Sequence, residues 1–469
     1  MSSTVEFVPG KRGKPNALWD GQRYLLDRKR GDKSYWKCTL YHQGCTGRLV
    51  LSNNVVSRST SHNHDEQNVE IVVHKSKQKL KKTATTSDFS SKTLAGTCCA
   101  EMVDREHRSK LGCNDESLKR MARRARQKSN HHPINPSSLE TLVIPPSYLR
   151  TASGDNLLIW DSGYSTDLRR SFLFATEDNL NLLQSSTNIV IDGTFKTSPN
   201  LFTQLLTVHA LYDNGWRIPS AYGLLPGKTE ILYTNLLEQL DEAADFCPDT
   251  VLTDFEMGLR NAVRNVWPGT TLRGCYFHFK QALWRRFAQS DLVPEYKVPG
   301  SPIRTAFKLI GALPFVPVDD IDLAWRLLKP TIPTDMAAFT TYFEHTWIGT
   351  SSSSPLFDTW SWNQHETVLA RLPRSSNLAE GWHNGFKSLV SCTNPTLWKF
   401  LDCLKLEQAI TDTKIARFLN RDDPPRRQSK WIKYDERLDR VINSYDRYTD
   451  VMEFLTVVAA LTIHNQMYI

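Results

Sequence analysis

Short apolar runs separated by turn residues dominate the first 70 residues of the chain. The runs are rich in strand-forming residues, and turns with Gly, Asn and Asp separate them. They read "VEFVP", "RYLLDR", "SYWKC", "RLVLS" and "NVVSRS". The pattern therefore predicts a small β-rich unit over residues 5–70.

The pattern changes in residues 71–135, where Lys, Ser and Thr are frequent. The stretch "HKSKQKLKKTATTSDFSSK" has too few apolar residues to build a core, so residues 74–132 are predicted to form a flexible linker. Within it, "DESLKRMARRARQK" over residues 115–128 has helical propensity. We therefore expect a basic linker that is partly helical.

From residue 136 the pattern is that of a mixed α/β domain. Three β-rich runs, "NIVIDGTF", "FTQLLTVHALY" and "RIPSAYGLL", precede the helical pattern "TEILYTNLLEQLDEAADF", and the strand "DTVLTDFE" follows. Three antiparallel strands, a crossover helix and a strand that returns beside the first form a ribonuclease-H-like sheet. Periodicity alone does not force this topology, but we expect it in residues 136–287.

The remainder of the chain is predicted to be mainly helical. Residues 288–373 are rich in Trp and Phe, which indicates a helical insertion. A further helix begins around "SNLAEGWHNGFKSLV" in residues 374–395, and two more helical patterns fill residues 396–469.

Charge divides the chain into two parts. Residues 1–135 carry 26 Lys and Arg against 13 Asp and Glu, which leaves 32 against 37 for residues 136–469. The net charges of +13 and −5 favour a polyanion as partner of the first part, although solubility alone is an alternative explanation. The candidate DNA-binding residues are Lys79, Lys81, Lys82, Arg120, Arg123, Arg124 and Arg126.

Composition sets outer limits. A chain of 469 residues with 40% hydrophobic residues predicts two to four domains. We expect no membrane partner, since no apolar stretch approaches the roughly 20 residues that span a bilayer. The first residues also lack the apolar run of a secretory signal. Nine cysteines at irregular spacing favour a reducing compartment over a disulfide framework.

Two cysteines and two histidines form a possible zinc site in the β-rich unit. On a strand, His62 and His64 would project to one face, and Cys38 and Cys45 fit opposite sides of a hairpin whose Gly44 eases the turn. The spacing departs from the common C-x2-C and H-x3-5-H template. Two buried thiols with two surface imidazoles therefore remain an alternative.

The surrounding residues resemble the FLYWCH zinc finger. The resemblance covers residues 5–64 in order, including the "TGR" after the second cysteine and the terminal "HNH". It rests on Phe7, Leu18, Tyr24, Trp36, Cys38, Cys45, His62 and His64. Such fingers are associated with DNA or protein binding. Because so small a unit buries little apolar surface, the zinc is expected to be structural.

Two aspartates follow apolar runs in the α/β domain. Asp192 ends "NIVID" and Asp254 ends "DTVLTD". If the two strands are adjacent and parallel, both carboxylates emerge at one edge of the sheet. Two such aspartates with a third acid can hold two divalent cations for phosphoryl transfer, and hard carboxylate oxygens suit Mg²⁺ or Mn²⁺.

Glu380 is the candidate for the third acid. It lies at the start of a predicted helix, beyond the helical stretch that follows Asp254. Asn377 three residues earlier makes a capping pattern, so Glu380 could instead only close a helix N-terminus. Glu256 would crowd Asp254 and is the weaker candidate.

Several segments of this part resemble, in order, the Mutator-like element (MULE) transposase domain, over about residues 142–387. They include "DGTFKTSPNLFTQLLTVHAL", "GLLPGKTEILYTNLLEQL", "LTDFEMGLRNAV", "GCYFHFKQALWRR" and "LPRSSNLAEGWHNGFK". The resemblance implies a DDE transposase of ribonuclease-H fold with the triad Asp192, Asp254 and Glu380. It also implies a C-x2-H motif at Cys275 and His278, for which a buried polar contact is favoured over a metal site. "SSN" stands where "TNN" is expected.

The predicted fold class is α+β and multidomain: a small β-rich zinc finger, then a ribonuclease-H-like α/β domain with a helical insertion and a helical C-terminal tail. The favoured function is a nuclear DNA-binding DDE-type transposase, or a protein derived from one, that forms a homo-oligomer on DNA ends. The alternative is a domesticated, catalytically inactive zinc-finger regulator that binds DNA. A zinc module that binds proteins would leave the basic charge unexplained.

Overall fold

The computed structural model describes residues 5–10, 14–86, 91–101, 114–129, 133–446 and 450–462. The chain divides into two compact units, Met1–Ile134 and Asn135–Ile469.

The first unit begins with a six-stranded antiparallel sheet in which each strand pairs with the next along the chain. Its small core includes the fully buried Tyr24 and the neighbouring Trp36. The strands are β1 (Glu6–Pro9), β2 (Pro15–Trp19), β3 (Gln22–Arg30), β4 (Lys33–Cys38), β5 (Arg48–Ser52) and β6 (Val55–Ser59). The predicted β-rich unit is therefore confirmed.

Within the part of the chain that the structure describes, three helices follow this sheet: α1 (Asn68–Thr86), α2 (Ser91–Ala100) and α4 (Asp115–Ser129). They pack on one another through a small apolar cluster that includes Leu80, Leu94 and Leu118. The expected flexible linker is thus replaced, in the described residues, by packed helices. Counting apolar residues missed this because short side chains such as Ala84 and Ala122, at helical spacing from Leu80 and Leu118, complete the buried stripes.

The second unit contains a seven-stranded sheet in the order β13-β12-β9-β10-β11-β8-β7. Strands β9, β10 and β11 are antiparallel, helix α6 (Glu230–Ala244) follows, and β12 returns parallel beside β9. The order predicted from the sequence is therefore present. The strands are β7 (Leu158–Asp161), β8 (Phe172–Phe174), β9 (Asn188–Thr194), β10 (Gln204–Leu211), β11 (Arg217–Leu225), β12 (Thr250–Thr253) and β13 (Thr271–Gly274).

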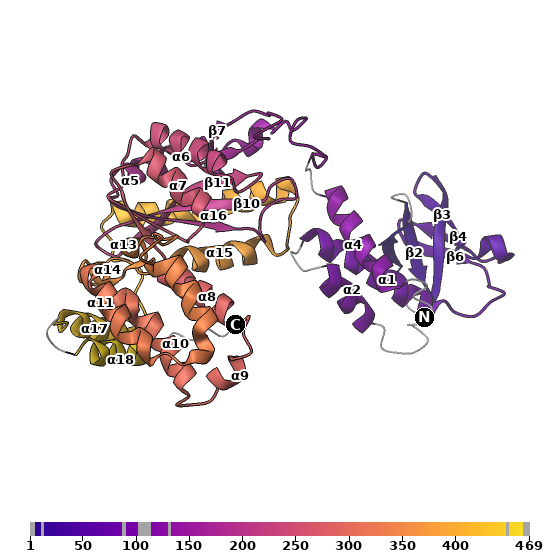
Figure 1. Ribbon diagram of the computed structural model, residues 1–469. Coiled ribbons are helices and arrows are strands. Elements are labelled where there is room, and N and C mark those ends of the chain that lie inside the picture. Colours follow the sequence, from indigo (N-terminus) through magenta and orange to yellow (C-terminus); the bar gives the residue numbers. More distant parts are fainter. Residues whose placement is uncertain are drawn as a thin grey trace. The chain divides into compact units, whose positions relative to one another are not determined.

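Helices cover both faces of this sheet (Figure 1). On one face, α5 (Glu177–Gln184), α6 and α7 (Met257–Val266) enclose a core with Ile189, Ile191 and Leu206. On the other, α15 (Asn377–Val390) and α16 (Leu397–Leu419) pack against Leu205 and Tyr222. Because strand side chains alternate between faces, consecutive residues such as Leu205 and Leu206 enter different cores.

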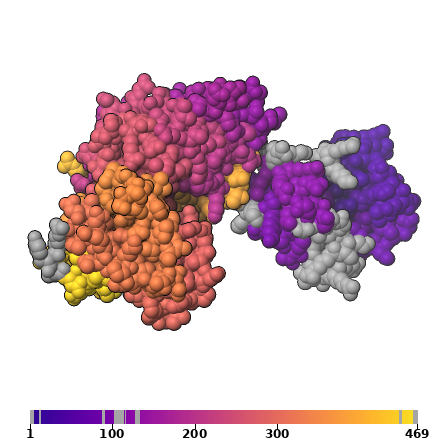
Figure 2. All heavy atoms as spheres, in the orientation of Figure 1, coloured from indigo at the N-terminus to yellow at the C-terminus, as the bar shows by residue number. Residues whose placement is uncertain are grey.

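A helical bundle forms the rest of the second unit, and its large core contains many aromatic side chains, among them Phe279, Trp347 and Trp362. Figure 2 shows this part, largely orange, adjoining the magenta surface of the sheet-bearing part. Its helices are α8 (Tyr276–Phe287), α9 (Val293–Tyr296), α10 (Pro302–Ala312), α11 (Ile321–Leu328), α12 (Ala337–Phe343), α13 (Thr359–Trp362), α14 (His365–Leu369), α17 (Ser429–Asn443) and α18 (Val451–Thr462). No helix of the described residues has the length and apolar character that crossing a membrane requires.

Candidate functional site

The four predicted zinc ligands converge in the first unit. Cys38 ends β4, Cys45 lies in the β4–β5 loop, and both histidines lie beyond the end of β6, in a loop rather than on the expected strand. Gly44 has a φ of 91°, so the left-handed turn before Cys45 suits a residue without a side chain. Convergence therefore depends on loops that the sheet anchors.

The spacing of the ligand atoms fits zinc. Cys38 Sγ lies 3.2 Å from His64 Nε2, Cys45 Sγ lies 3.4 Å from His62 Nδ1, and these two ring nitrogens are 3.2 Å apart. All four ligand atoms lie within 4.8 Å of one another. With Zn–S distances of about 2.3 Å and Zn–N distances of about 2.0 Å, neighbouring ligand atoms of a tetrahedral zinc site lie about 3.3–3.8 Å apart. The four side chains therefore form a Cys2His2 cluster suited to a structural zinc ion.

Groups around the cluster orient both imidazoles. Tyr24 Oη lies 2.8 Å from His62 Nε2, and the Asp65 carbonyl oxygen lies 2.7 Å from His64 Nδ1. Each histidine thus directs its other nitrogen at the cluster. Such outer contacts fix the tautomer and ring position of metal-binding histidines.

Gly47, the central residue of the "TGR" sequence, packs against the zinc ligands. A Cβ atom at Gly47 would lie 2.3 Å from the His62 ring, so no larger residue fits without displacing a ligand. Its backbone N–H also donates to Cys45 Sγ over 3.3 Å, and the Leu40 N–H donates to Cys38 Sγ over 3.4 Å. Both sulfur atoms thus accept a backbone hydrogen bond, an outer contact of the kind that positions metal ligands.

The two aspartates lie at one end of the second sheet. Val190 of β9 pairs with Leu252 of β12, and both side chains enter the small cluster that also contains Ala379 of α15. Asp192 and Asp254 each follow two residues later. Because side chains alternate along a strand, Asp192 of β9 lies toward the face that α15 covers, and Asp254 directly follows the last residue of β12 at the same end of the sheet.

Glu380 lies in the first turn of α15, toward the same end of the sheet. Its Oε1 is 4.0 Å from His278 Nε2, and its side chain is 33% exposed. The N-cap of α15 is Ser376, which makes no side-chain capping hydrogen bond, so the predicted Asn377–Glu380 capping pair does not form. The Glu380 carboxylate is therefore not used in capping the helix. We call Asp192, Asp254 and Glu380 together the acidic end of the sheet.

Burial and like charge change the acidity of this group. Burial raises the pKa of Asp192 to about 7; the charge of His278 opposes the rise, and Asp254 and Glu380 add to it. Burial also raises the pKa of Glu380, again opposed by His278. The three carboxylates are thus close enough to interact electrostatically, as those of a cation site do.

Glu256 has other partners. It accepts a hydrogen bond of 2.9 Å from Tyr233 Oη and lies 3.6 Å from Lys228 Nζ. Its backbone N–H donates to Asp254 Oδ1 over 3.0 Å. Glu256 therefore stabilises the turn that carries Asp254.

Two family models match the chain at these sites. Residues 7–64 match the FLYWCH zinc finger domain, and residues 188–282 match the MULE transposase domain. The chain carries a FLYWCH finger and a MULE domain. All four cysteine and histidine ligands fall inside the first match, and Asp192 and Asp254 fall inside the second, which ends before Glu380. A comparison with curated proteins found no match.

The two matches indicate a transposase-like DNA-binding protein with a structural zinc site. Among the described residues, the finger's cluster is the only group of three or more metal-ligating side chains gathered this closely. Asp192, Asp254 and Glu380 interact at longer range.

Cys275 and His278 connect the start of α8 to α15. Cys275 is buried, its Sγ accepts a hydrogen bond of 3.2 Å from the Ser376 N–H, and it precedes Tyr276 at the N-cap of α8. Burial lowers the pKa of His278, but the Cys275 thiol and then Asp192 and Asp254 raise it, to about 9. The pair thus ties two helices together and presents a positive charge to the acids.

The sequence did not single out His383. Its Nδ1 lies 3.4 Å from Asp192 Oδ2, and its Nε2 lies 3.2 Å from Thr207 Oγ1, which in turn lies 3.2 Å from His209 Nε2. Asp192 therefore lies next to a series of buried polar side chains, His383, Thr207 and His209. The available signal was the spacing Glu-x-x-His, which places His383 one helical turn from Glu380.

The candidate DNA-binding residues lie on two helices of the first unit. Lys79, Lys81 and Lys82 belong to α1, and the four arginines belong to α4. Lys79 pairs with Glu101 and Arg123 with Glu116, whereas Arg126 Nε donates to the Ala84 carbonyl oxygen. Within the described residues, Lys82, Arg120 and Arg124 are exposed and have no such partner. These three are the most available for phosphate contacts.

Proposed function

We propose that the protein is a DDE-type transposase, or a protein derived from one, that cleaves and joins DNA strands by two-metal phosphoryl transfer. In this proposal Asp192, Asp254 and Glu380 hold Mg²⁺ or Mn²⁺. The observation that carries it is that Asp192 lies on β9 and Asp254 directly follows the adjacent parallel strand β12, while Glu380 lies close enough to Asp192 to interact with it electrostatically. The protein would act in the nucleus, as a homo-oligomer assembled on DNA ends.

The residues of the acidic end fit this task. Carboxylate oxygens are hard ligands of the kind that Mg²⁺ prefers. When bound, two divalent ions would activate a water or a 3′-hydroxyl group and stabilise the leaving oxygen. The raised pKa of Asp192 fits a carboxylate whose charge a cation would balance, because burial and its acidic neighbours penalise the ionised form without one.

The chain's other residues support the same site. His278 places a positive charge beside the carboxylates, and its protonated ring would lie near the negatively charged backbone of a bound DNA strand. The buried His383 ring lies 3.4 Å from the Asp192 carboxylate. The FLYWCH finger and the basic helices α1 and α4 would bind DNA without taking part in the chemistry.

The central experiment compares the parent with Asp192→Asn in DNA nicking and strand transfer with Mg²⁺ or Mn²⁺. The asparagine keeps the shape but loses the charge, so cleavage should fall by several orders of magnitude while DNA binding persists. Asp291→Asn, which changes an exposed acid after α8, serves as the control and should cleave normally. Mn²⁺ titration of each protein provides a second readout that does not require the correct DNA ends.

Glu380→Gln tests the third position separately. We expect cleavage to be lost while the free energy of unfolding changes by about 1 kcal/mol or less. A side chain at a helix terminus typically contributes no more than this to stability. Cleavage equal to the parent would make Glu380 structural and remove it from the triad.

A catalytically inactive DNA-binding regulator is the second candidate. The observation that favours it is the looser grouping of the three acids compared with the cysteine and histidine cluster of the finger. Absence of both Mn²⁺ binding and cleavage in the parent, with DNA binding intact, would establish this second function.

A further inference from the structure

A basic pocket lies in the second unit, at the end of the sheet opposite the acidic residues. It encloses about 810 Å³ and is lined by the start of β9, the β10–β11 turn, residues 370–373 and residues 423–432. Asn188 begins β9 at this pocket, whereas Asp192 lies toward the other end of the same strand. The pocket is therefore distinct from the proposed cation site.

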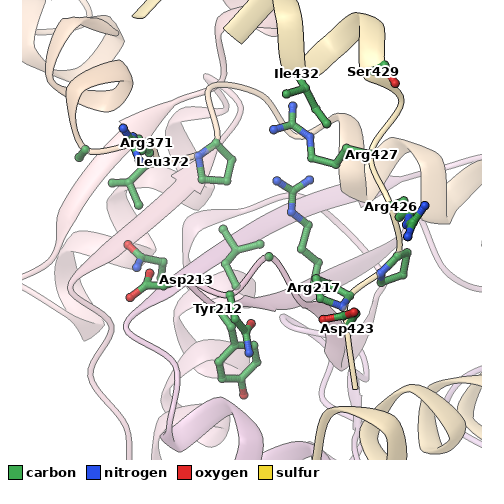
Figure 3. Close-up of a pocket in the computed structure, with 18 residues that line it drawn as sticks. Tyr212, Asp213, Arg217, Arg371, Leu372, Asp423, Arg426, Arg427, Ser429 and Ile432 are labelled. Carbon is green, nitrogen blue, oxygen red and sulfur yellow. The ribbon is translucent and has the colours of Figure 1, made fainter. Parts of the chain in front are cut away.

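Arginines dominate the charge of the pocket. Its lining carries four arginines and two aspartates, although residues 136–469 as a whole have more acidic than basic residues. The charged residues are Arg217, Arg371, Arg426, Arg427, Asp213 and Asp423. Figure 3 shows the side chains of Arg217 and Arg427 extending into the same space.

Arg217 lacks a counterion of its own. Its side chain is half-buried, and its guanidinium makes no hydrogen bond or ion pair with any described residue. Burial lowers its pKa, the charge of Arg427 lowers it further, and Asp435 opposes both. Asp435 already pairs with Arg427, at 2.6 Å, and with Arg374. The Asp435 carboxylate is thus shared among several arginines and does not neutralise Arg217 alone.

We infer that this pocket binds phosphate groups of a DNA backbone. A half-buried cation that faces another cation is unfavourable until an anion enters, and guanidinium groups match phosphate oxygens in bidentate geometry. DNA is the phosphate-bearing partner that the two domain matches indicate. The inference goes beyond catalysis, because the pocket can bind DNA whether or not the carboxylates cleave it.

The test uses the full chain and the salt dependence of its DNA affinity. For each phosphate that a variant no longer neutralises, the slope of log affinity against log salt should fall by about 0.9. Arg217→Gln and Arg426→Gln should each reduce the slope. Arg217→Lys keeps the charge but loses the bidentate fork, so it should keep the parent slope while its affinity lies between those of the parent and Arg217→Gln. Arg440→Gln, an exposed arginine of α17 outside the pocket, is the matched control and should keep the parent slope.

Hydrogen exchange locates the contact. DNA should slow exchange in peptides that cover residues 211–217 and 426–432 in the parent and in Asp192→Asn, but less in Arg217→Gln. Arg426 is exposed, so its variant should fold even if Arg217→Gln does not. If DNA slows exchange at these peptides in a parent protein that never cleaves DNA, the pocket binds DNA as inferred, and the missing cleavage refutes the proposed catalysis separately.

Three results would overturn the inference. The first is an unchanged slope in Arg426→Gln and in any folded Arg217→Gln, together with no protection by DNA. The second is protection by pyrophosphate but not by DNA, which would assign the pocket to a free phosphate compound. The third is protection by a glutamate-rich peptide but not by DNA, which would assign it to an acidic protein segment.

Discussion

The Nδ1 atom of His383 in helix α15 lies 3.4 Å from the Oδ2 atom of Asp192 in strand β9. The other ring nitrogen lies 3.2 Å from the Thr207 hydroxyl oxygen, so both nitrogens have a polar neighbour. Burial lowers the pKa of His383 to about 4, so its ring is neutral beside Asp192, and the Thr207 hydroxyl donates to the Asp192 carbonyl oxygen over 3.2 Å. The His383 ring thus lies against one oxygen of the carboxylate, and Thr207 contacts both residues.

We expect His383→Leu to weaken Mn²⁺ binding by about 10- to 100-fold, the usual effect of removing a residue that orients a metal ligand. His383→Asn retains a donor and should lose less. Titration calorimetry of the full chain measures both, and melting temperature shows whether the variants fold. Parent-like Mn²⁺ affinity in folded His383→Leu would show that the contact does not position Asp192.

Removal of zinc should unfold the FLYWCH finger. The sheet of the finger has a small core, so its four ligands should provide much of its stability. Metal analysis should find about one zinc per chain, and Cys45→Ser should reduce this strongly, whereas Cys247→Ser, at an exposed cysteine, should not. Zinc content that survives Cys45→Ser would contradict the ligand set.

The basic helices should contribute DNA affinity that is independent of sequence. Replacing Lys82, Arg120 and Arg124 together by Gln should flatten the salt dependence by about 0.9 for each phosphate that is no longer neutralised. Binding to specific and unrelated DNA should weaken by similar factors, because phosphate contacts carry no base information. Filter binding over a range of salt concentrations checks this, and an unchanged slope would place the phosphate contacts elsewhere.

His209 should make the second unit less stable in acid. Burial lowers its pKa to about 3, below its ordinary value, with smaller contributions from His383 and Lys414. As pH falls below about 6.5 the unfolded chain gains a proton that the folded chain excludes, so between pH 7 and 5 this residue should cost about 2 kcal/mol. Urea unfolding measures the loss; it should shrink in His209→Gln, but not in His345→Gln, at an exposed histidine.

Local patterns were sufficient for the elements and for one metal site. Short apolar runs separated by turn residues located the strands of the finger, and the order of strands and helix from residue 188 to 253 predicted that β12 would return beside β9. Cys38, Cys45, His62 and His64 were identifiable because they occur within a short segment that one small sheet brings together.

The sequence alone determined the fold class, the two domain types and the charge difference between the two parts of the chain, since each depends on the type and order of nearby residues. The tertiary structure decided that helices α1, α2 and α4 pack on one another, that the His383 ring lies next to Asp192, and that Arg217 shares a pocket with Arg427. These relationships join residues far apart in the chain. No local periodicity encodes such distances, because the packing of whole helices and strands sets them.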